Sequence, residues 1–295
     1  MKVFIFLVAA IFIVSVIYFG VSAYIATVLT VPGKSPLVYD ETKIGERVTD
    51  VAFKASDGLP LAGWYFPGTS DKAILFVHGA GNQNRANEVY GAPEIAKHFV
   101  GLGYTVLMFD LRGTGESAKT RISFGQYEKN DVEGAFEYLK TQDFKPESIG
   151  IISDSLGAIS TIMASGVVKG AGGIVLDSPA TEVKPIVSNI MTNENNVPRI
   201  LHPGAFFMAK FLYKIDIDEV RPIDKISELK STPLLFLHGE NDTLIPPSNS
   251  ELLMEQVDNG TRILFPDSGH VETYTKHPEQ YLLEVTKFFD ANLKK

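Results

Sequence analysis

Three residues, Ser155, Asp242 and His270, have the types and the chain order that suit nucleophilic catalysis. A serine hydroxyl is a weak nucleophile until a base removes its proton, and the base needs a third group to orient it. Each of the three residues follows a short apolar run that is typical of a buried strand. The pattern therefore predicts a serine nucleophile, an aspartate and a histidine base that the fold must bring together.

Ser155 lies at a predicted joint between a strand and a helix. Residues 149–152 are apolar and rich in β-branched side chains, which predicts a strand, and residues 156–163 can be helical. A serine on such a sharp turn needs small residues two positions before and two positions after it. Ser153 and Gly157 meet this need, although glycine is usual at both positions. A serine-rich strand end without chemistry is the alternative interpretation.

The composition is that of a globular protein. With 295 residues, 45% of them hydrophobic, the chain can bury a full core, and one large α/β domain is favoured over two. The net charge of −8 and the scattered basic residues argue against nucleic acid as a partner. The sequence has no cysteine, and its acidic and histidine residues lack metal-ligand spacing, so we expect no metal and no cofactor.

The amino-terminal stretch differs from the rest, because residues 3–31 carry no charged side chain. About 20 apolar residues cross a bilayer, so residues 1–31 are expected to form a transmembrane anchor. Lys2 favours a cytoplasmic amino end and an extracytoplasmic catalytic domain. A cleaved signal peptide, which would make the protein secreted, is the alternative, since Val-Ser-Ala at 21–23 resembles a cleavage site. The apolar run continues past that site, which favours the anchor.

After a polar linker at residues 32–46, short apolar strands alternate with helices through residues 47–295. A hairpin is expected at 47–66, strands at 73–77, 104–109, 149–152, 173–176, 234–237 and 262–265, and helices at 86–100, 126–140, 156–163 and 278–293. This alternation predicts an α/β fold with a mostly parallel central sheet, flanked by helices, and a ligand site beyond the carboxyl ends of the strands. Residues from about 181 to 230 lack a strong strand and are expected to form a small helical lid.

Five stretches together resemble the α/β-hydrolase superfamily, close to the serine-aminopeptidase-like and monoglyceride-lipase-like hydrolases, some of which are membrane-anchored. They are His78-Gly79, Asp-Leu-Arg-Gly-Thr-Gly at 110–115, the turn around Ser155, His-Gly-Glu-Asn-Asp at 238–242 with Ile245-Pro246, and Ser-Gly-His at 268–270. They span nearly the whole domain. The resemblance implies an α/β-hydrolase fold in which His270 is the general base and Asp242 is the acid that orients it.

Two residues compete for these roles. Asp177 follows an earlier strand and is the rival acid, because some relatives use that position, but the His-Gly-Glu-x-Asp run favours Asp242. His277 is the nearest competitor of His270. It precedes a proline at a helix start, whereas Ser268 and Gly269 give His270 the tight loop that relatives have.

The tetrahedral intermediate of acyl transfer carries a negative oxygen that needs preorganised donors. The resemblance implies that the backbone N–H groups of Leu156 and Ala80 form this oxyanion hole. His78 and His238, each in a His-Gly turn, are interpreted as structural histidines that hold their loops.

Two other groups are also open to structural interpretations. We expect Asp110 and Arg112 to brace the loop between the sheet and Ser155 rather than to touch substrate. The stretch 205–213 contains a run of apolar side chains that either line an acyl pocket or pack the lid onto the domain: Phe206, Phe207, Met208, Phe211, Leu212 and Tyr213.

These features predict a membrane-anchored serine hydrolase that cleaves small-molecule or lipid carboxylic esters through an acyl-enzyme on Ser155. A peptidase or thioesterase with the same triad is one alternative. A non-catalytic binding protein on the hydrolase fold is another, although such a protein is free to lose Ser155 or His270. A dehalogenase would need a carboxylate in place of Ser155.

Overall fold

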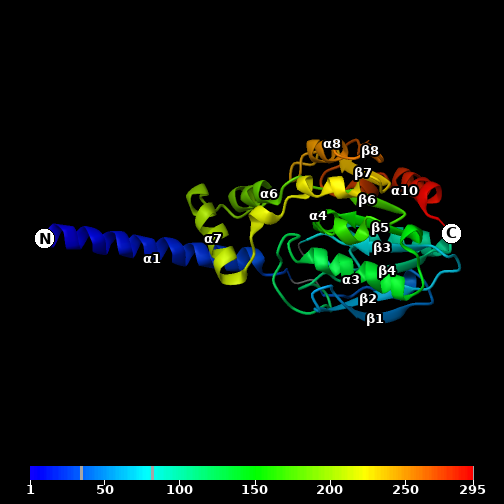
Figure 1. Cartoon of the computed structure of the whole chain (residues 1–295), viewed down its shortest axis with the longest axis horizontal. Coiled ribbons are helices and arrows are strands. Elements are labelled where there is room, and N and C mark those ends of the chain that lie inside the picture. Colours follow the sequence, from blue (N-terminus) through cyan, green and yellow to red (C-terminus); the bar gives the residue numbers. More distant parts are fainter. Residues whose placement is uncertain (34–35, 81–82, 295) are drawn as a thin grey trace.

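The computed structural model describes residues 1–33, 36–80 and 83–294. One long helix, α1 (Lys2–Thr30), extends from an α/β domain that contains the other elements (Figure 1). Parts of three predicted segments lie outside the described residues: Lys34 and Ser35 of the linker, Gly81 and Asn82 after the His-Gly turn, and Lys295.

In the described part of the chain, eight strands form one sheet in the order β1-β2-β4-β3-β5-β6-β7-β8. The strands are β1 (Thr49–Lys54), β2 (Pro60–Phe66), β3 (Ala73–Val77), β4 (Thr105–Phe109), β5 (Ile149–Asp154), β6 (Gly173–Asp177), β7 (Leu234–Gly239) and β8 (Gly260–Phe265). Strand β2 is antiparallel to its neighbours β1 and β4, and the other pairs are parallel. The prediction of a mostly parallel α/β sheet is confirmed.

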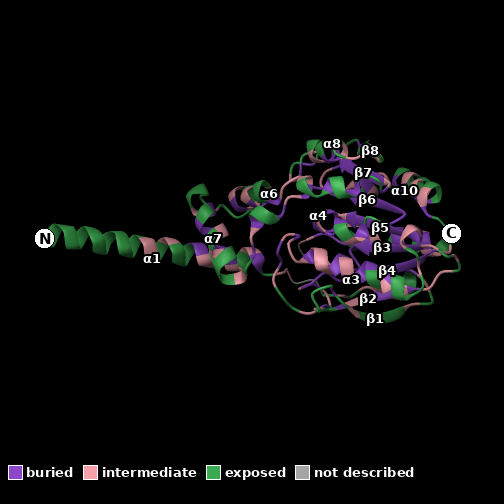
Figure 2. Cartoon of the chain, in the orientation of Figure 1, coloured by how far each residue is buried: buried purple, intermediate pink, exposed green. Residues whose placement is uncertain are grey.

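Helices cover both faces of the sheet because successive side chains of a strand point to opposite faces. In β3, Leu75 belongs to one buried cluster, and Ile74 and Phe76 belong to the other. The first cluster includes residues of α3 (Glu128–Thr141), α4 (Leu156–Met163), α5 (Ser165–Val168) and α8 (Ser248–Met254). The second includes residues of α2 (Ala92–Gly101) and α10 (Pro278–Asn292), and the short α9 (Thr273–Lys276) leads into α10. The inner strands β3 to β7 are almost wholly buried, whereas the edge strands β1 and β8 are mostly exposed or half-buried (Figure 2).

One predicted helix is partly wrong. The stretch 86–100 was expected to be helical throughout, but α2 begins only at Ala92, after a 3₁₀ turn at Glu88–Tyr90. Gly91 separates the two with a positive φ of 76°, a conformation that glycine adopts easily. The ring of Tyr274 occupies the space that a side chain at position 91 would need. Pro93 in the first turn then starts α2.

The segment between β6 and β7 is helical, as expected for the lid. It contains α6 (Val183–Asn189), a π-helical turn at Ile190–Glu194, α7 (His202–Tyr213) and several 3₁₀ turns. Helix α7 packs against the carboxyl half of α1, where Ser22, Ala26 and Thr30 are buried, whereas the amino half of α1 is exposed (Figure 2). Gly204 allows this close approach, since a side chain there would overlap Ser22 Oγ.

Candidate active site

Ser155 sits on a sharp bend between β5 and α4. Its backbone has φ 48° and ψ −113°, which is a strained conformation for a residue with a side chain. Two backbone hydrogen bonds hold it there: the Ser155 N–H donates to Asp177 O at 2.9 Å, and Ser155 O accepts from the Ile159 N–H at 2.9 Å. Strain of this kind costs about 1–3 kcal/mol and persists only where the surrounding structure enforces it.

The residues two positions before and after Ser155 are small for different reasons. Gly157 presses on the end of β3, and any side chain there would overlap the carbonyl oxygen of Val77. Ser153 has room for its hydroxyl, which is buried and donates a hydrogen bond to Val175 O at 3.0 Å. The serine that replaces the usual glycine is therefore accommodated by the neighbouring strand β6.

The structure brings Ser155, His270 and Asp242 into one hydrogen-bonded chain. His270 Nε2 lies 2.9 Å from Ser155 Oγ, and His270 Nδ1 lies 2.8 Å from Asp242 Oδ2. The carboxylate can only accept, so Nδ1 carries the proton and Nε2 is left to accept from the serine hydroxyl. This is the arrangement in which an imidazole activates a serine.

The acid is held in an environment that keeps it ionised. Asp242 Oδ1 accepts from the backbone N–H groups of Leu244 at 3.0 Å and Ile245 at 2.8 Å. Burial raises the pKa of Asp242, but hydrogen bonds from His238, His270 and the Ile245 N–H outweigh burial and hold that pKa below its usual value. A carboxylate that stays charged can stabilise an imidazolium on His270.

The two competing residues are placed elsewhere. Asp177 is buried, and its carboxylate accepts hydrogen bonds from Ser178 Oγ and from Thr273 Oγ1, not from His270. Burial raises the pKa of Asp177. Asp177 is nevertheless linked to the loop that carries His270, which we call the histidine loop. The link is Ser178 Oγ, which also accepts from the N–H of Val271 at 3.2 Å. His277 Nε2 is 2.7 Å from Pro266 O, and that contact lies outside the chain of three residues.

The predicted oxyanion donors belong to two segments that are close to Ser155. Leu156 opens α4, and a helix leaves the N–H groups of its first turn without partners inside the helix. Ala80 follows Gly79, whose N–H donates to Asp154 Oδ2 at 3.1 Å. Gly79 also lies close to Ser155, because a Cβ added to Gly79 would be 3.2 Å from Ser155 Cβ. The loop of Ala80 is thus packed against the nucleophile.

Both histidines of the His-Gly turns make structural contacts. His78 Nδ1 donates to Gly79 O at 2.7 Å, and Nε2 accepts from the Leu111 N–H at 3.1 Å. Burial lowers the pKa of His78, so the ring is neutral, as these contacts require. His238 Nε2 donates to Ile245 O at 2.8 Å and lies 3.3 Å from Asp242 Oδ2, so it fixes the loop that carries the acid.

Asp154, to which the sequence pattern assigns no role, is a partly buried carboxylic acid directly before Ser155. It pairs in register with Asp177 on the neighbouring strand β6. Burial and the nearby charge of Asp177 raise the pKa of Asp154 to about 7. Both residues line a cavity of about 30 Å³ together with Tyr281. The acidic residue next to Ser155 is visible in the sequence. Its pairing with Asp177 is not, because that pairing depends on the register of β5 with β6.

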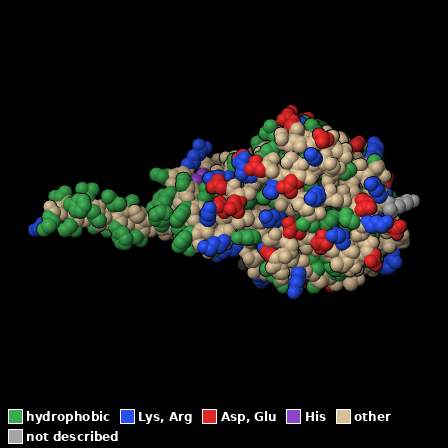
Figure 3. Space-filling view, in the orientation of Figure 1, with side chains coloured by type: hydrophobic (Ala, Val, Ile, Leu, Met, Phe, Trp, Pro, Cys, Tyr) green, Lys and Arg blue, Asp and Glu red, His purple; other side chains and the backbone are tan. Residues whose placement is uncertain are grey.

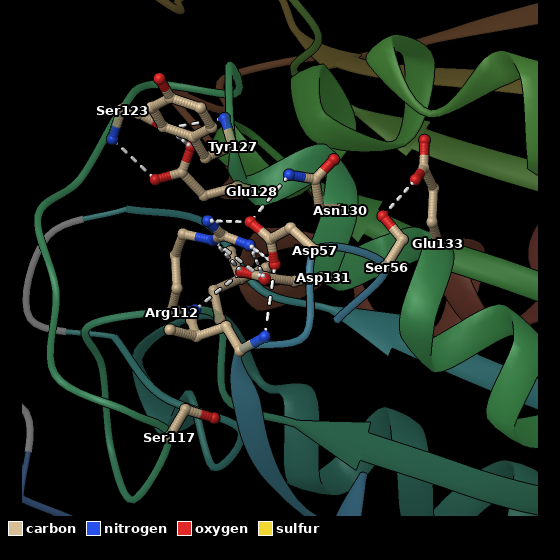
Figure 4. Close-up of polar contacts among 12 residues, drawn as sticks. Ser56, Asp57, Arg112, Ser117, Ser123, Tyr127, Glu128, Asn130, Asp131 and Glu133 are labelled. Atoms are coloured by element: carbon tan, nitrogen blue, oxygen red, sulfur yellow. Dashed lines mark hydrogen bonds and ion pairs between the residues drawn. The ribbon is translucent and has the colours of Figure 1, made fainter. Parts of the chain in front are cut away.

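Asp110 and Arg112 brace the loop after β4. Asp110 accepts from the backbone N–H of Arg85 at 2.8 Å and from its guanidinium at 2.9 Å. Arg112 binds Asp131 of α3 and Asp57 of the β1–β2 turn, with N–O distances of 2.7 and 2.9 Å for its closest contacts to each (Figure 4). These contacts tie three segments together, and neither residue touches Ser155 in any contact described here.

The apolar run of the lid divides into two groups. Phe206 packs into a cluster that contains Ile159 of α4, and Met208 and Tyr213 pack beside Ala26 of α1. The other three, Phe207, Phe211 and Leu212, are exposed to solvent. The exposed group therefore does not pack the lid onto the domain, although Phe207 lines a cavity of about 470 Å³ on the lid together with Phe206 and Lys210. Within the described ranges, no group of three or more acidic or histidine residues is arranged to hold a metal ion.

Comparison with known proteins gives the family. A family model described as serine aminopeptidase, S33, matches residues 68–228, which is more than half of the chain. The chain belongs to this family. The match covers the bend at Ser155 and ends before Asp242 and His270. The resemblance to α/β-hydrolases of the serine-aminopeptidase-like group is confirmed.

The similarity of this S33 protein to its relatives covers most of the chain. The uncharacterized protein YqkD of Bacillus subtilis (strain 168) is 27% identical over 252 residues, 83% of this chain and 81% of YqkD. The Pyrococcus furiosus esterase PF2001 superimposes with a TM-score of 0.75 at 23% identity, covering 90% of this chain and 99% of the esterase. A bacterial membrane phospholipase A has a TM-score of 0.59 at 17% identity and covers 99% of both chains. These two structures show that the fold is shared.

Arg112 should contribute mainly to stability. Arg112→Met leaves Asp131 buried without its partner, and breaking such a pair costs about 3–5 kcal/mol. Asp57→Asn is the matched control, because it removes only the partly exposed partner and should cost about 1 kcal/mol or less. Denaturant unfolding of both variants measures the difference. An Arg112→Met protein with normal stability but a raised KM would instead place Arg112 in substrate binding.

The two acids should differ sharply in catalysis. Asp242→Asn changes the tautomer that His270 adopts, and we expect kcat to fall by about 10⁴. Asp177→Asn weakens contacts to the histidine loop, each worth about 1 kcal/mol, so kcat should fall by about tenfold at most. Ester turnover under saturating substrate measures both. A larger loss in Asp177→Asn than in Asp242→Asn would make Asp177 the acid.

Proposed function

We propose that this protein is a membrane-anchored serine hydrolase that cleaves carboxylic esters through an acyl-enzyme on Ser155. His270 is the general base and Asp242 is the acid that orients it. The observation that carries this proposal is the hydrogen-bonded chain from Asp242 through His270 to a serine on a strained bend.

Acylation begins when Ser155 Oγ attacks the ester carbonyl carbon and its proton passes to His270 Nε2. The charge of Asp242 stabilises the resulting imidazolium. The carbonyl oxygen becomes an oxyanion, and the N–H groups of Leu156 and Ala80 are the donors proposed to bind it. Donors that are already oriented in the ground state lower the barrier because they need not reorganise.

The tetrahedral intermediate then collapses. The bond between the carbonyl carbon and the alcohol oxygen breaks, and His270 gives its proton to that oxygen, which leaves an acyl group on Ser155. In deacylation His270 takes a proton from water, whose oxygen attacks the acyl carbon. The carboxylic acid departs and the proton returns to Ser155 Oγ, so the enzyme is regenerated.

The ester assignment is supported by the structural neighbours, which include an esterase and a phospholipase A. The family description, serine aminopeptidase, favours a peptidase as the second candidate. The two activities use the same groups and differ in the leaving group, which is an alcohol in one and an amine in the other. A panel of esters graded by acyl length, run beside aminoacyl anilides, separates them.

The membrane anchor is supported by α1, which has 29 residues and a mean hydropathy of 2.8 in its most apolar window. The carboxyl part of α1 is integrated into the domain: Thr30 O accepts from the Ile122 N–H at 2.9 Å, and Arg121 donates to Thr27 O at 3.2 Å and to Thr30 Oγ1 at 2.9 Å. Cleavage after residue 23 would separate this part from Tyr18, which bonds to the lid at Gly204. A retained anchor agrees best with these contacts, and Lys2 favours a cytoplasmic amino end.

A fluorophosphonate probe should label Ser155, because an activated serine attacks such reagents. Ser155→Ala should abolish both labelling and ester turnover, and His270→Ala should lower turnover by about four orders of magnitude or more. Ser153→Ala is the matched control, since that neighbouring hydroxyl is buried and bonded to the β6 backbone. Persistent turnover in Ser155→Ala would refute the assignment, and loss of labelling in both serine variants would point to misfolding of the bend.

The anchor predicts the behaviour of the protein on fractionation. The full-length chain should stay with membranes after a carbonate wash and dissolve only in detergent, and its mass should include the residues before position 23. Protease added to the outer side should digest the domain in sealed spheroplasts. A soluble product that begins near residue 24 would show that α1 starts as a signal peptide.

A further inference from the structure

The lid exposes a group of large apolar side chains on one side of the molecule. Ile200, Phe207, Phe211 and Leu212 have exposed fractions of 76%, 55%, 62% and 43%, and we call these four residues the lid face. Phe207 and Phe211 are one helical turn apart, and their rings stack with centroids 6.1 Å apart. A large apolar group left open to water in this way marks an interaction surface.

The lid face adjoins the apolar surface of α1. The rings of Phe19 and Phe207 are 5.8 Å apart. Tyr18 OH donates to Ile200 O at 2.9 Å and accepts from the Gly204 N–H at 3.1 Å, which fixes the start of α7 beside this part of α1. Hydrophobic side chains gather where α1 meets the lid and continue along α1 (Figure 3). The two surfaces thus form one apolar region.

The length of α1 determines where the lid face would lie relative to the hydrocarbon layer of a membrane. A helix rises 1.5 Å per residue, so about 20 residues cross a hydrocarbon layer about 30 Å thick. Counted from Val3, the first uncharged residue after Lys2, the crossing ends near Ser22. Phe19, which touches Phe207, is therefore one turn below the outer boundary of the layer. Tyr18 and Tyr24 flank this level, and tyrosine is enriched at membrane interfaces.

We propose that the lid face rests in the outer interface of the lipid bilayer as a second membrane contact, and that the site takes amphiphilic esters from that surface. This inference rests on the proposed anchor and the proposed ester hydrolysis. Helices with one apolar face lie in the interface with that face among the acyl chains, and the lid face has the position and the polarity to do so. The continuous apolar surface with α1 favours lipid over a second protein as the occupant.

An apolar cluster connects the lid with the active site. Phe206, the neighbour of Phe207, packs in a cluster with Ile25 of α1, Ile159 and Ile245. Ile159 lies one helical turn after Ser155, and Ile245 donates its N–H to Asp242. The packing that links the lid face to the reacting groups is therefore apolar in this cluster, and its polarity matches an acyl chain better than a polar substrate.

The absence of cysteine allows a direct test with single labels. Phe211→Cys, labelled with an environment-sensitive fluorophore in the full-length protein, is reconstituted into phosphatidylcholine vesicles with or without brominated acyl chains. We expect blue-shifted emission that the brominated lipid quenches. Leu283→Cys on α10, with an exposed fraction of 52%, is the matched control and should report water. Ile11→Cys in α1 reports the anchor and should be quenched.

The label positions separate the possible failures. Quenching at position 11 with aqueous emission at 211 would overturn the lid contact and leave the anchor standing. Blue-shifted emission at 211 that brominated lipid does not quench would also overturn it, because protein, such as a second copy of this chain, would cover the lid face. No quenching at either position would overturn both the anchor and the contact.

Turnover gives an independent readout. Phe207→Asp with Phe211→Asp should lower the hydrolysis of a long-chain ester carried in vesicles by at least about fivefold relative to that of a short water-soluble ester, since two charges oppose insertion. Leu283→Asp should leave this ratio unchanged. An equal fall for both esters would overturn delivery from the bilayer. If the unmodified protein hydrolysed neither ester, the proposed hydrolase activity would be wrong. The quenching experiment would still test the membrane contact of the lid face.

Discussion

The strained bend at Ser155 is the constraint on which the rest of the structure depends. A residue with positive φ persists at this place because its backbone is hydrogen-bonded on both sides, to the end of β6 and to Ile159 of α4. Gly157 lets α4 press on β3, so the bend cannot relax outward. The position of one hydroxyl is thereby fixed by three parallel strands, and two loops that start from β7 and β8 have only to reach it.

Those loops are ordered by polar groups buried at the carboxyl ends of the strands. His238 and the backbone around Ile245 hold Asp242, and Asp177 holds the histidine loop through Ser178 and Thr273. Buried charges are costly unless they are bonded, so each carboxylate here also organises a segment of chain. The residues proposed for catalysis, and those in contact with them, therefore also shape the site.

Much of this could be predicted from sequence because the signals are local. Apolar runs of four to six residues indicated the strands, and the polar residues after them indicated the edge where Ser155, Asp242 and His270 meet. The start of α2 could not be placed, because it depends on Gly91 lying against the distant Tyr274. The same holds for Asp154, whose burial follows from its register with Asp177, and for the contact of α1 with the lid. These features depend on neighbours more than twenty residues away.

The contact between Gly204 and Ser22 fixes the position of the lid along α1. Because the two helices interlock at that point, α7 cannot slide along α1 by a turn without losing both the fit and the hydrogen bonds of Tyr18. The distance between the apolar half of α1 and the bend at Ser155 is therefore a built-in length rather than the variable reach of a flexible tether. The bend at Ser155 therefore stands at a set distance from whatever surface receives the exposed half of α1.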